Sequence, residues 1–237
     1  MMTKVLHSLE VPVLVAVPLV MGLCAYFQIE QGALLTLLVV FAALSLMFVG
    51  WEKSKPALRQ IMPTVVLGSL AAAGRILFAP FPSFKPVLAI CIIAGVIFGK
   101  RSGFMVGALA ALVSNMFFGQ GPWTPWQMYS WGLIGYLAGV VADFGWFGRE
   151  DEAATLRKAA PILVFGFLSA LFSGFILNSW YVVGFVVPLT LPGALAAYAA
   201  GLPLDLVHGT ATVVFLSALY LPWRRKLMRI KRKFDLS

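Results

Sequence analysis

Apolar segments follow one another along most of this chain, and short polar or basic stretches separate them. A helix needs about 20 mostly apolar residues to cross a bilayer, and the alternating pattern typical of a membrane barrel is absent. The pattern therefore predicts an all-α integral membrane protein. We expect eight transmembrane helices, at about residues 11–28, 33–50, 61–79, 86–99, 103–118, 128–147, 159–178 and 206–222.

Two of the apolar segments are irregular. The segment at 86–99 is short for a span, so we expect it to be tilted or supported by neighbouring helices. The stretch Trp180–Leu204 is apolar, but prolines and glycines interrupt it. Counting it as a further span would place the basic C-terminal tail outside the cell. We therefore expect an external or re-entrant segment, which is tolerated only where protein covers its backbone.

Composition and charge support this interpretation. The chain is 61% hydrophobic and only 11% charged, against about 25% charged residues in soluble domains. Its net charge is +9, but the basic residues cluster at segment ends, which indicates membrane topology rather than a nucleic-acid partner. With the N-terminus in the cytoplasm, 16 of the 18 Lys and Arg residues lie on that side. We predict a multi-pass protein of the bacterial plasma membrane with both termini in the cytoplasm.

The chain divides into three regions. Residues 1–60 hold two almost featureless helices and a charged linker, and residues 61–223 hold a six-helix core. Residues 224–237 form a basic cytoplasmic tail, which we interpret as a stop-transfer anchor on anionic lipid. The first two helices have no assigned role and contact either a partner subunit or only lipid.

The segment Gly119–Gln127 carries two Trp, two Pro, two Gln and two Gly between two spans. Tryptophan is common at membrane interfaces, which is the simpler interpretation. It does not explain the stiff Gly-Gln-Gly-Pro backbone beside the two indoles. We therefore predict an external loop that stacks on a flat organic ligand and hydrogen-bonds to it. The expected contacts are Asn115, Gln120, Trp123, Trp126 and Gln127.

Four further polar residues are candidates for the same site. Arg75 lies within a span, where a charge is costly and usually functional, although it can also snorkel to the outer surface. Lys85, in a proline-rich external loop, can meet an anionic ligand group or a lipid headgroup. Asp205 and His208 share one helix face, and Asp205 is also a plausible helix N-cap.

Small residues in the third span form overlapping small-xxx-small pairs, which let helix backbones approach closely. The pairs are Gly68 with Ala72 and Ser69 with Ala73. They pack either against another helix of the same chain or against another membrane subunit. We keep both possibilities, and the second makes these four residues a subunit-docking face.

Other chemistries find little support. The turn Gly99–Gly103 lacks the spacing of a phosphate-binding loop, so any ATPase must be a separate chain. One His and one Asp do not make a metal site, and the free cysteines Cys24 and Cys91 lie in apolar runs. We expect no metal, no cofactor and no enzymatic activity.

The segments discussed above resemble the substrate-binding S component of an energy-coupling factor (ECF) vitamin transporter. The resemblance covers about residues 61–223 and rests on Leu67–Arg75, Phe81–Pro86, the Phe-Gly-x-x-x-Gly-Phe core at 98–104, Gly107–Asn115 and Gly201–His208. It implies a protein that binds a vitamin from outside, associates with a transmembrane coupling subunit and two ATPases, and topples to release its cargo. The docking face would then contact the coupling subunit.

The phrase Phe-Phe-Gly-Gln-Gly-Pro-Trp-Thr-Pro-Trp-Gln-Met at 117–128 resembles the branch associated with cobalamin or its precursors. This favours a corrinoid ligand, while riboflavin or another aromatic vitamin would suit the same residues. The alternatives outside this family are a stand-alone secondary transporter, a membrane-embedded enzyme and a structural scaffold.

Overall fold

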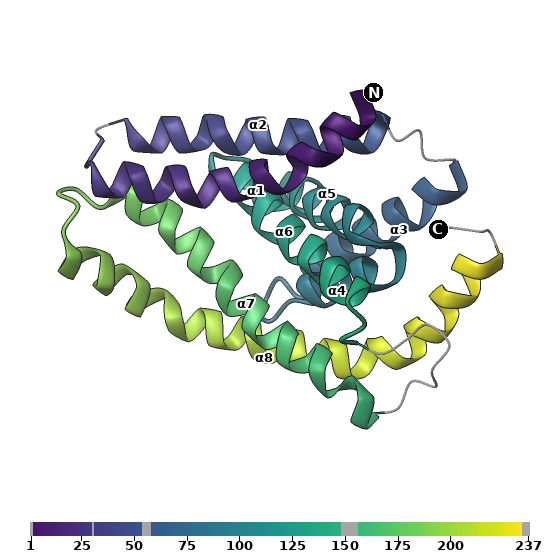
Figure 1. Ribbon diagram of the computed structural model, residues 1–237. Coiled ribbons are helices and arrows are strands. Elements are labelled where there is room, and N and C mark those ends of the chain that lie inside the picture. Colours follow the sequence, from purple (N-terminus) through teal and green to yellow (C-terminus); the bar gives the residue numbers. More distant parts are fainter. Residues whose placement is uncertain (1, 30, 54–57, 148–155, 234–237) are drawn as a thin grey trace.

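The computed structural model describes residues 2–29, 31–53, 58–147 and 156–233, and the regular structure in these ranges is entirely helical. Figure 1 shows the arrangement. Five segments in the described ranges are long and apolar enough to cross a membrane. The prediction of an all-α membrane protein is confirmed. The helices are α1 Met2–Tyr26, α2 Gly32–Lys53, α3 Leu58–Leu77, α4 Val87–Phe98, α5 Lys100–Phe118, α6 Trp123–Asp143, α7 Leu156–Phe185 and α8 Leu191–Lys233.

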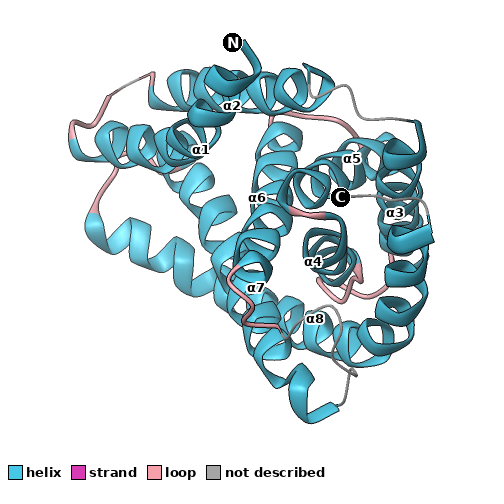
Figure 2. Ribbon diagram, turned by 45° about the vertical axis from the view of Figure 1, so that its right-hand side comes forward, coloured by secondary structure: helices cyan, strands magenta, loops and turns pink. Residues whose placement is uncertain are grey.

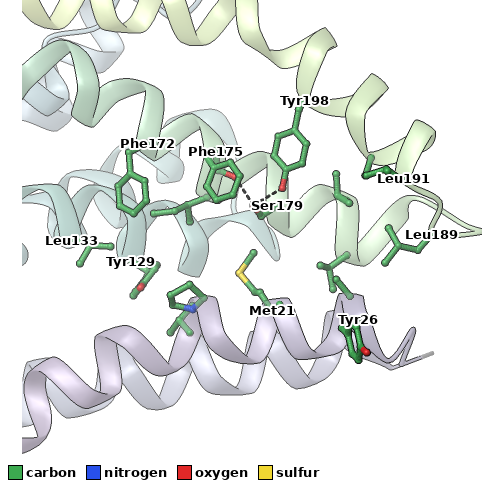
Figure 3. A pocket seen from close by; sticks show the side chains of 18 of the residues that line it. Met21, Tyr26, Tyr129, Leu133, Phe172, Phe175, Ser179, Leu189, Leu191 and Tyr198 are labelled. Atoms are coloured by element: carbon green, nitrogen blue, oxygen red, sulfur yellow. Dashed lines mark hydrogen bonds between the residues drawn. The ribbon is translucent and has the colours of Figure 1, made fainter.

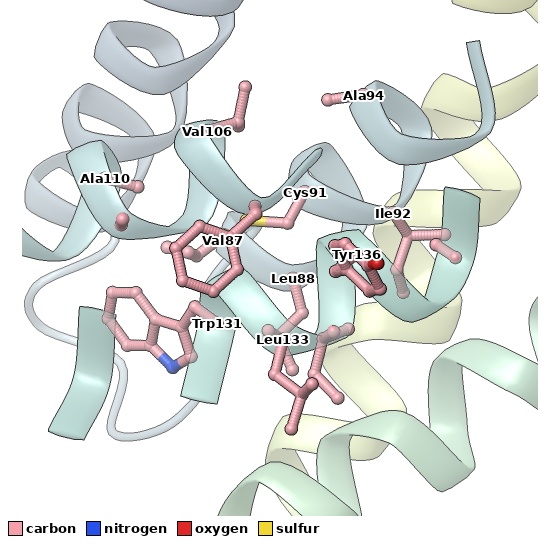
Figure 4. Close-up of a cluster of buried hydrophobic side chains, with 14 of the residues drawn as sticks. Val87, Leu88, Cys91, Ile92, Ala94, Val106, Ala110, Trp131, Leu133 and Tyr136 are labelled. Carbon is pink, nitrogen blue, oxygen red and sulfur yellow. The ribbon is translucent and has the colours of Figure 1, made fainter. Parts of the chain in front are cut away.

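Helix α4 is the centre of the fold, with α3, α5, α6 and α8 around it (Figure 2). At 12 residues it is about 18 Å long, well short of the roughly 30 Å hydrocarbon core. Ten of its residues are buried, because the sequence is apolar on every side of the helix. Neighbouring helices therefore support this short segment, as the sequence suggested. Figure 4 shows Val87, Leu88 and Cys91 among side chains of α5 and α6.

Glycines allow α4, α5 and α6 to lie unusually close together. A Cβ atom added at Gly103 of α5 would lie 2.3 Å from the carbonyl oxygen of Gly135 in α6. The reverse holds at Gly135, where a Cβ atom would lie 2.2 Å from the Gly103 carbonyl oxygen. A Cβ atom added at Gly95 of α4 would lie 2.1 Å from the Gly135 carbonyl oxygen. Only glycine fits at these three contacts, which fix the relative positions of the helices that carry the site.

The N-terminal helices are joined to the core by specific polar contacts. Glu10 of α1 is buried and forms an ion pair with Arg101 at the start of α5, at 2.7 Å. The Tyr136 hydroxyl donates to the second oxygen of Glu10 at 3.4 Å. Helix α2 packs on α6 and α7. The hairpin of α1 and α2 is therefore packed onto the core through specific contacts, which the sequence pattern did not predict.

The structure corrects the predicted start of the sixth helix. Helix α6 begins at Trp123, so most of the expected external loop Gly119–Gln127 is helical. The prolines that suggested a loop are compatible with a helix start, because the first N–H groups of a helix have no helical acceptor and a proline there loses nothing. Pro122 precedes the helix and Pro125 is its third residue. The true connection is only Gly119–Pro122.

The stretch Trp180–Leu204 is likewise mostly helical. Helix α7 runs on to Phe185 and α8 begins at Leu191, which leaves 186–190 as the connection. Helix α8 continues without a break through Pro203 and through the basic positions up to Lys233. The prolines and glycines leave these helices intact, because Pro192 lies in the first turn of α8 and interior proline and glycine are tolerated in membrane helices. The expectation that this stretch is external or re-entrant stays a prediction.

The ends of the helices are consistent with the predicted topology. Helix α1 begins, α2 ends, α7 begins and α8 ends at one side of the bundle, the right-hand side of Figure 1. The orientation in the membrane itself stays a prediction. The predicted orientation depends partly on basic residues whose side chains the structure does not describe: Lys4, Lys55, Arg59, Arg149, Arg157 and Lys158.

Candidate substrate site

A polar cavity of about 300 Å³ lies where the 78–86 loop meets α3, α4, α6, α7 and α8. It brings together four residues that the sequence singled out and that lie up to 133 positions apart. Apolar residues complete the wall. The polar, charged and aromatic lining residues are Arg75, Ser83, Lys85, Trp131, Asn178, Asp205 and His208.

Arg75 is held in place by residues of α5 and α6. Its Nη1 donates to Ser114 Oγ at 2.7 Å and to Asn115 Oδ1 at 2.5 Å. Its guanidinium carbon lies 4.5 Å from the ring centre of Phe118 and 5.0 Å from that of Trp131, distances typical of cation–π contacts. No carboxylate in the described residues forms an ion pair with it. The guanidinium therefore keeps donors and uncompensated charge for a ligand.

Asn115 is the centre of a buried amide network behind Arg75. Its Nδ2 donates to Thr124 Oγ1 at 2.9 Å and to Gln127 Oε1 at 2.8 Å. Thr124 in turn donates to Gln120 Oε1 at 2.9 Å, and Gln120 Nε2 donates to the Leu112 carbonyl. The network joins the end of α5 to the start of α6. It fixes the acceptor that orients Arg75.

The residues of the 119–127 segment lie outside the polar cavity lining. Trp126 is fully buried and stacks on Trp180 at 6.4 Å between ring centres. Trp123 is 39% exposed, and its ring covers Gly121. The expected ligand contacts of this segment stay a prediction. Asn115 contacts Arg75 directly, and Gln127 and Gln120 are linked to it through hydrogen bonds with Asn115 and Thr124.

Helices α7 and α8 are in close contact at two points, and at each point a glycine of one helix faces a polar side chain of the other. Asn178 Nδ2 donates to Asp205 Oδ2 at 3.0 Å. A Cβ atom at Gly174 would lie 2.2 Å from the Asp205 carboxylate, and one at Gly201 would lie 2.5 Å from the Asn178 amide. Asp205 lies well inside α8, so the N-cap interpretation is wrong. Its carboxylate and the Asn178 amide instead face each other at the cavity.

The 78–86 loop is fastened by Lys85. Its ammonium donates to the Phe78 carbonyl and, at 3.1 Å, to the Ala79 carbonyl. These carbonyls follow the end of α3, and Lys85 satisfies them without a ligand. Burial and, to a smaller extent, the charge of Arg75 lower the pKa of this ammonium. Phe84 packs on Phe215 of α8 at 5.4 Å, which seats the loop over the cavity.

Three polar or aromatic lining residues were missed from the sequence: Ser83, Trp131 and Asn178. Trp131 is 5% exposed, and its indole N–H has no acceptor in the described structure. A buried donor without a partner is uncommon, and a ligand acceptor would satisfy it. Trp131 was missed because it lies within an apolar run and so resembles a residue of the hydrophobic core. Asn178 had a usable signal, since it is an amide four residues after Gly174 in an apolar helix.

The small residues of α3 divide between two faces. Gly68 and Ala72 are buried, and a Cβ atom at Gly68 would lie 3.2 Å from Leu109 of α5. This pair serves packing within the chain. Ser69 and Ala73 are exposed on the other face. Only this second pair remains available for docking another subunit.

The polar cavity has the character of a site for a neutral or electron-rich organic molecule. Arg75 and Trp131 supply its hydrogen-bond donors, and Asp205 supplies acceptors. Its volume lies at the lower end of the range for small-molecule sites, which is about 300 to 1,000 Å³. The described residues contain no group of three or more His, Cys, Asp or Glu side chains placed to hold a metal ion.

Comparison with known proteins identifies the family. The family model described as "ECF-type riboflavin transporter, S component" matches residues 60–224. The chain belongs to this family. The match covers α3 to α8 and leaves the α1–α2 hairpin outside it. The matched region thus includes every helix that lines the polar cavity.

Curated relatives of this S component are UPF0397 proteins. One from Aliivibrio fischeri (strain MJ11) is 29% identical over 113 residues, which are 45% of this chain and 61% of the relative. One from Vibrio atlanticus (strain LGP32) is 34% identical over 74 residues, 31% of this chain and 40% of the relative. The matches thus span less than two thirds of these relatives. No solved structure matches the chain significantly.

Proposed function

We propose that this chain is the substrate-binding subunit of an ATP-driven vitamin importer, and that the polar cavity beside Arg75 is the vitamin site. The observation that carries the proposal is the free donor set around one small cavity. Arg75 has no carboxylate partner among the described residues, and the Trp131 N–H has no acceptor there. Such groups in an apolar helical bundle are costly unless a ligand meets them.

The ligand we propose is a flat aromatic vitamin of the size of riboflavin. A tricyclic flavin ring offers carbonyl and ring-nitrogen acceptors to Arg75 and Trp131, and its ribityl hydroxyls suit Asp205 and Asn178. A corrinoid is far larger than a cavity of about 300 Å³. The family match, whose description names riboflavin, also lends no support to the cobalamin branch. Both observations favour the smaller vitamin.

The proposed partners are a transmembrane coupling subunit and a pair of ATPase subunits. The sequence holds no nucleotide-binding motif, so the energy must come from another chain. Ser69 and Ala73 on the exposed face of α3 are the proposed contact, since small residues allow close helix approach. The role is binding and delivery, without chemistry on the vitamin.

The alternative within transport is a secondary transporter that works alone. Uptake measurements with vesicles distinguish the ATP-driven importer from the secondary transporter. Vesicles holding only this chain should bind vitamin without accumulating it, and vesicles that also hold the coupling subunit and ATPases should accumulate it when ATP is supplied. Accumulation by the chain alone under an ion gradient would contradict the proposal.

The ligand itself can be identified by purification. The protein expressed in cells that contain all common vitamins should carry one of them, detectable by absorbance and mass spectrometry. A flavin spectrum is the expected result. A corrinoid spectrum would overturn the substrate class but leave the transport role. A protein that carries no vitamin and binds none when titrated would contradict both.

A further inference from the structure

A second and larger cavity lies outside the polar site, between α1 and the helices α6, α7 and α8. Its volume is about 610 Å³. Figure 3 shows Met21 and Tyr26 of α1 on one wall, and Phe175, Ser179 and Tyr198 on the opposite one. Because α1 lies outside the residues matched by the family model, this cavity is formed only with the additional hairpin.

The walls of this cavity offer almost nothing to a polar molecule. Tyr129 donates its hydroxyl to the Leu14 carbonyl at 2.6 Å. Ser179 donates to the Phe175 carbonyl and is hydrogen-bonded to Tyr198, both at 2.7 Å. These hydroxyls are therefore already satisfied by the protein, and the remaining lining is mainly aliphatic and aromatic carbon. A water-soluble vitamin would lose its hydration there without replacement.

The length of the cavity matches one leaflet of a bilayer. Its lining on α1 runs from Val17 to Tyr26, a rise of about 14 Å along the helix. Half of the hydrocarbon core is about 15 Å thick. The polar groups gather at the end formed by the α7–α8 connection, where Gln28 donates to the Leu189 carbonyl and Thr190 accepts from the Gly193 N–H. An apolar chain with a polar head at this end fits that distribution.

We propose that this cavity binds one hydrocarbon chain of a membrane lipid, inserted along α1 with the headgroup beside residues 189–190. A second protein chain does not fit, because 14 Å of α-helix about 10 Å in diameter occupies roughly 1,100 Å³. Access from the bilayer lies at Gly22, which is exposed and has no atom within 4 Å of an added Cβ. The α1–α2 hairpin is thereby a lipid-binding addition to the S-component core.

The test places a large side chain in the cavity at Gly22, where an added Cβ atom meets no neighbour within 4 Å. In native mass spectrometry of the purified full chain, the wild type should retain one phospholipid that Gly22→Trp loses. Leu19→Trp is the matched control, because Leu19 is 60% exposed and outside the cavity lining, and it should retain the lipid. Vitamin binding should be unchanged in both variants. Equal lipid retention by Gly22→Trp and the wild type would overturn the proposal.

A second measurement uses the unaltered protein and so does not depend on the variant folding. The wild type is placed in phosphatidylglycerol–phosphatidylethanolamine vesicles that contain a phospholipid with a diazirine on its acyl chain. Illumination should label peptides containing 17–26 and 189–198 at least fivefold more than peptides from outward helix faces away from the cavity, such as the one containing Leu38, which is exposed and outside the cavity lining. Uniform labelling of exposed helix faces, a cross-linked dimer through α1, or displacement of the label by free vitamin would each contradict the assignment.

Discussion

The guanidinium of Arg75 donates to the side-chain oxygen of Asn115 across 2.5 Å, although the two residues lie on different helices and 40 positions apart. Asn115 is fully buried, and its amide nitrogen is held by Thr124 and Gln127. The amide thus has one orientation, which presents its oxygen to Arg75. The segment with the unusual composition therefore contributes to the site by positioning Arg75.

Removing this acceptor should weaken ligand binding without removing a ligand contact. Asn115→Leu keeps the approximate volume and deletes a hydrogen bond to a charged group, which is worth about 1.5 to 3 kcal/mol. We expect the dissociation constant for the vitamin to rise roughly tenfold or more, measured by equilibrium titration. Gln31→Leu, an amide removed at an exposed position far from the site, should leave the constant unchanged. An unaltered affinity in well-folded Asn115→Leu would contradict the positioning role.

A methyl group at Gly174 should disturb the cavity from the opposite side. In Gly174→Ala the new Cβ would lie 2.2 Å from the Asp205 carboxylate, so Asp205 must move and its hydrogen bond with Asn178 is strained. Gly184→Ala on the same helix makes only an ordinary 3.5 Å contact with Ala33. We expect vitamin affinity to fall several-fold in the first variant alone. Equal affinities in the two would show that Asp205 is not part of the site.

The ion pair between α1 and α5 should respond asymmetrically to mutation. The Glu10 side chain is 3% exposed and that of Arg101 is 27% exposed. Arg101→Met leaves the buried Glu10 carboxylate without its partner, which should lower the free energy of unfolding by on the order of 3 kcal/mol. In Glu10→Gln, the Arg101 guanidinium loses its partner but can be solvated by water, so the loss should be smaller. The thermal midpoint in detergent should fall more for Arg101→Met. The double variant should recover part of the loss, and a larger loss in Glu10→Gln would contradict this account.

The contact between Tyr129 and Leu14 compensates for a proline. Pro18 lacks the N–H that would bond to the Leu14 carbonyl in an α-helix, and the Tyr129 hydroxyl donates to that carbonyl instead. Tyr129→Phe should therefore cost about 1 to 3 kcal/mol through an unsatisfied carbonyl. Adding Pro18→Ala, which restores a helical N–H, should return most of the thermal stability. Additive losses in the double variant would refute the compensation.

The sequence was sufficient for the fold class and for four of the residues that line the polar cavity. Arg75, Lys85, Asp205 and His208 stood out because charges and imidazoles are rare in apolar helices, and the structure places all four at one cavity. The short α4 was also anticipated as a helix supported by its neighbours. These conclusions need only residue chemistry and segment length.

The remaining features depend on contacts between helices that local patterns do not show. Proline suggested a loop at Pro122–Pro125 and an irregular segment near Pro192, yet both positions are helix starts where proline is tolerated. Trp131 looked like core, and its unpaired N–H is visible only once the helices are placed. The split of Gly68 and Ser69 between two faces likewise follows from where α5 packs.

The central claim is that the cavity beside Arg75 holds the vitamin. Its most direct test is a fluorescence titration of riboflavin with purified wild type, Arg75→Met and Arg229→Met, the last removing an exposed arginine near the end of α8. Wild type and Arg229→Met should quench flavin fluorescence with the same dissociation constant, and Arg75→Met should bind at least tenfold more weakly. Equal affinities in all three proteins, or no binding of riboflavin by the wild type, would contradict the account.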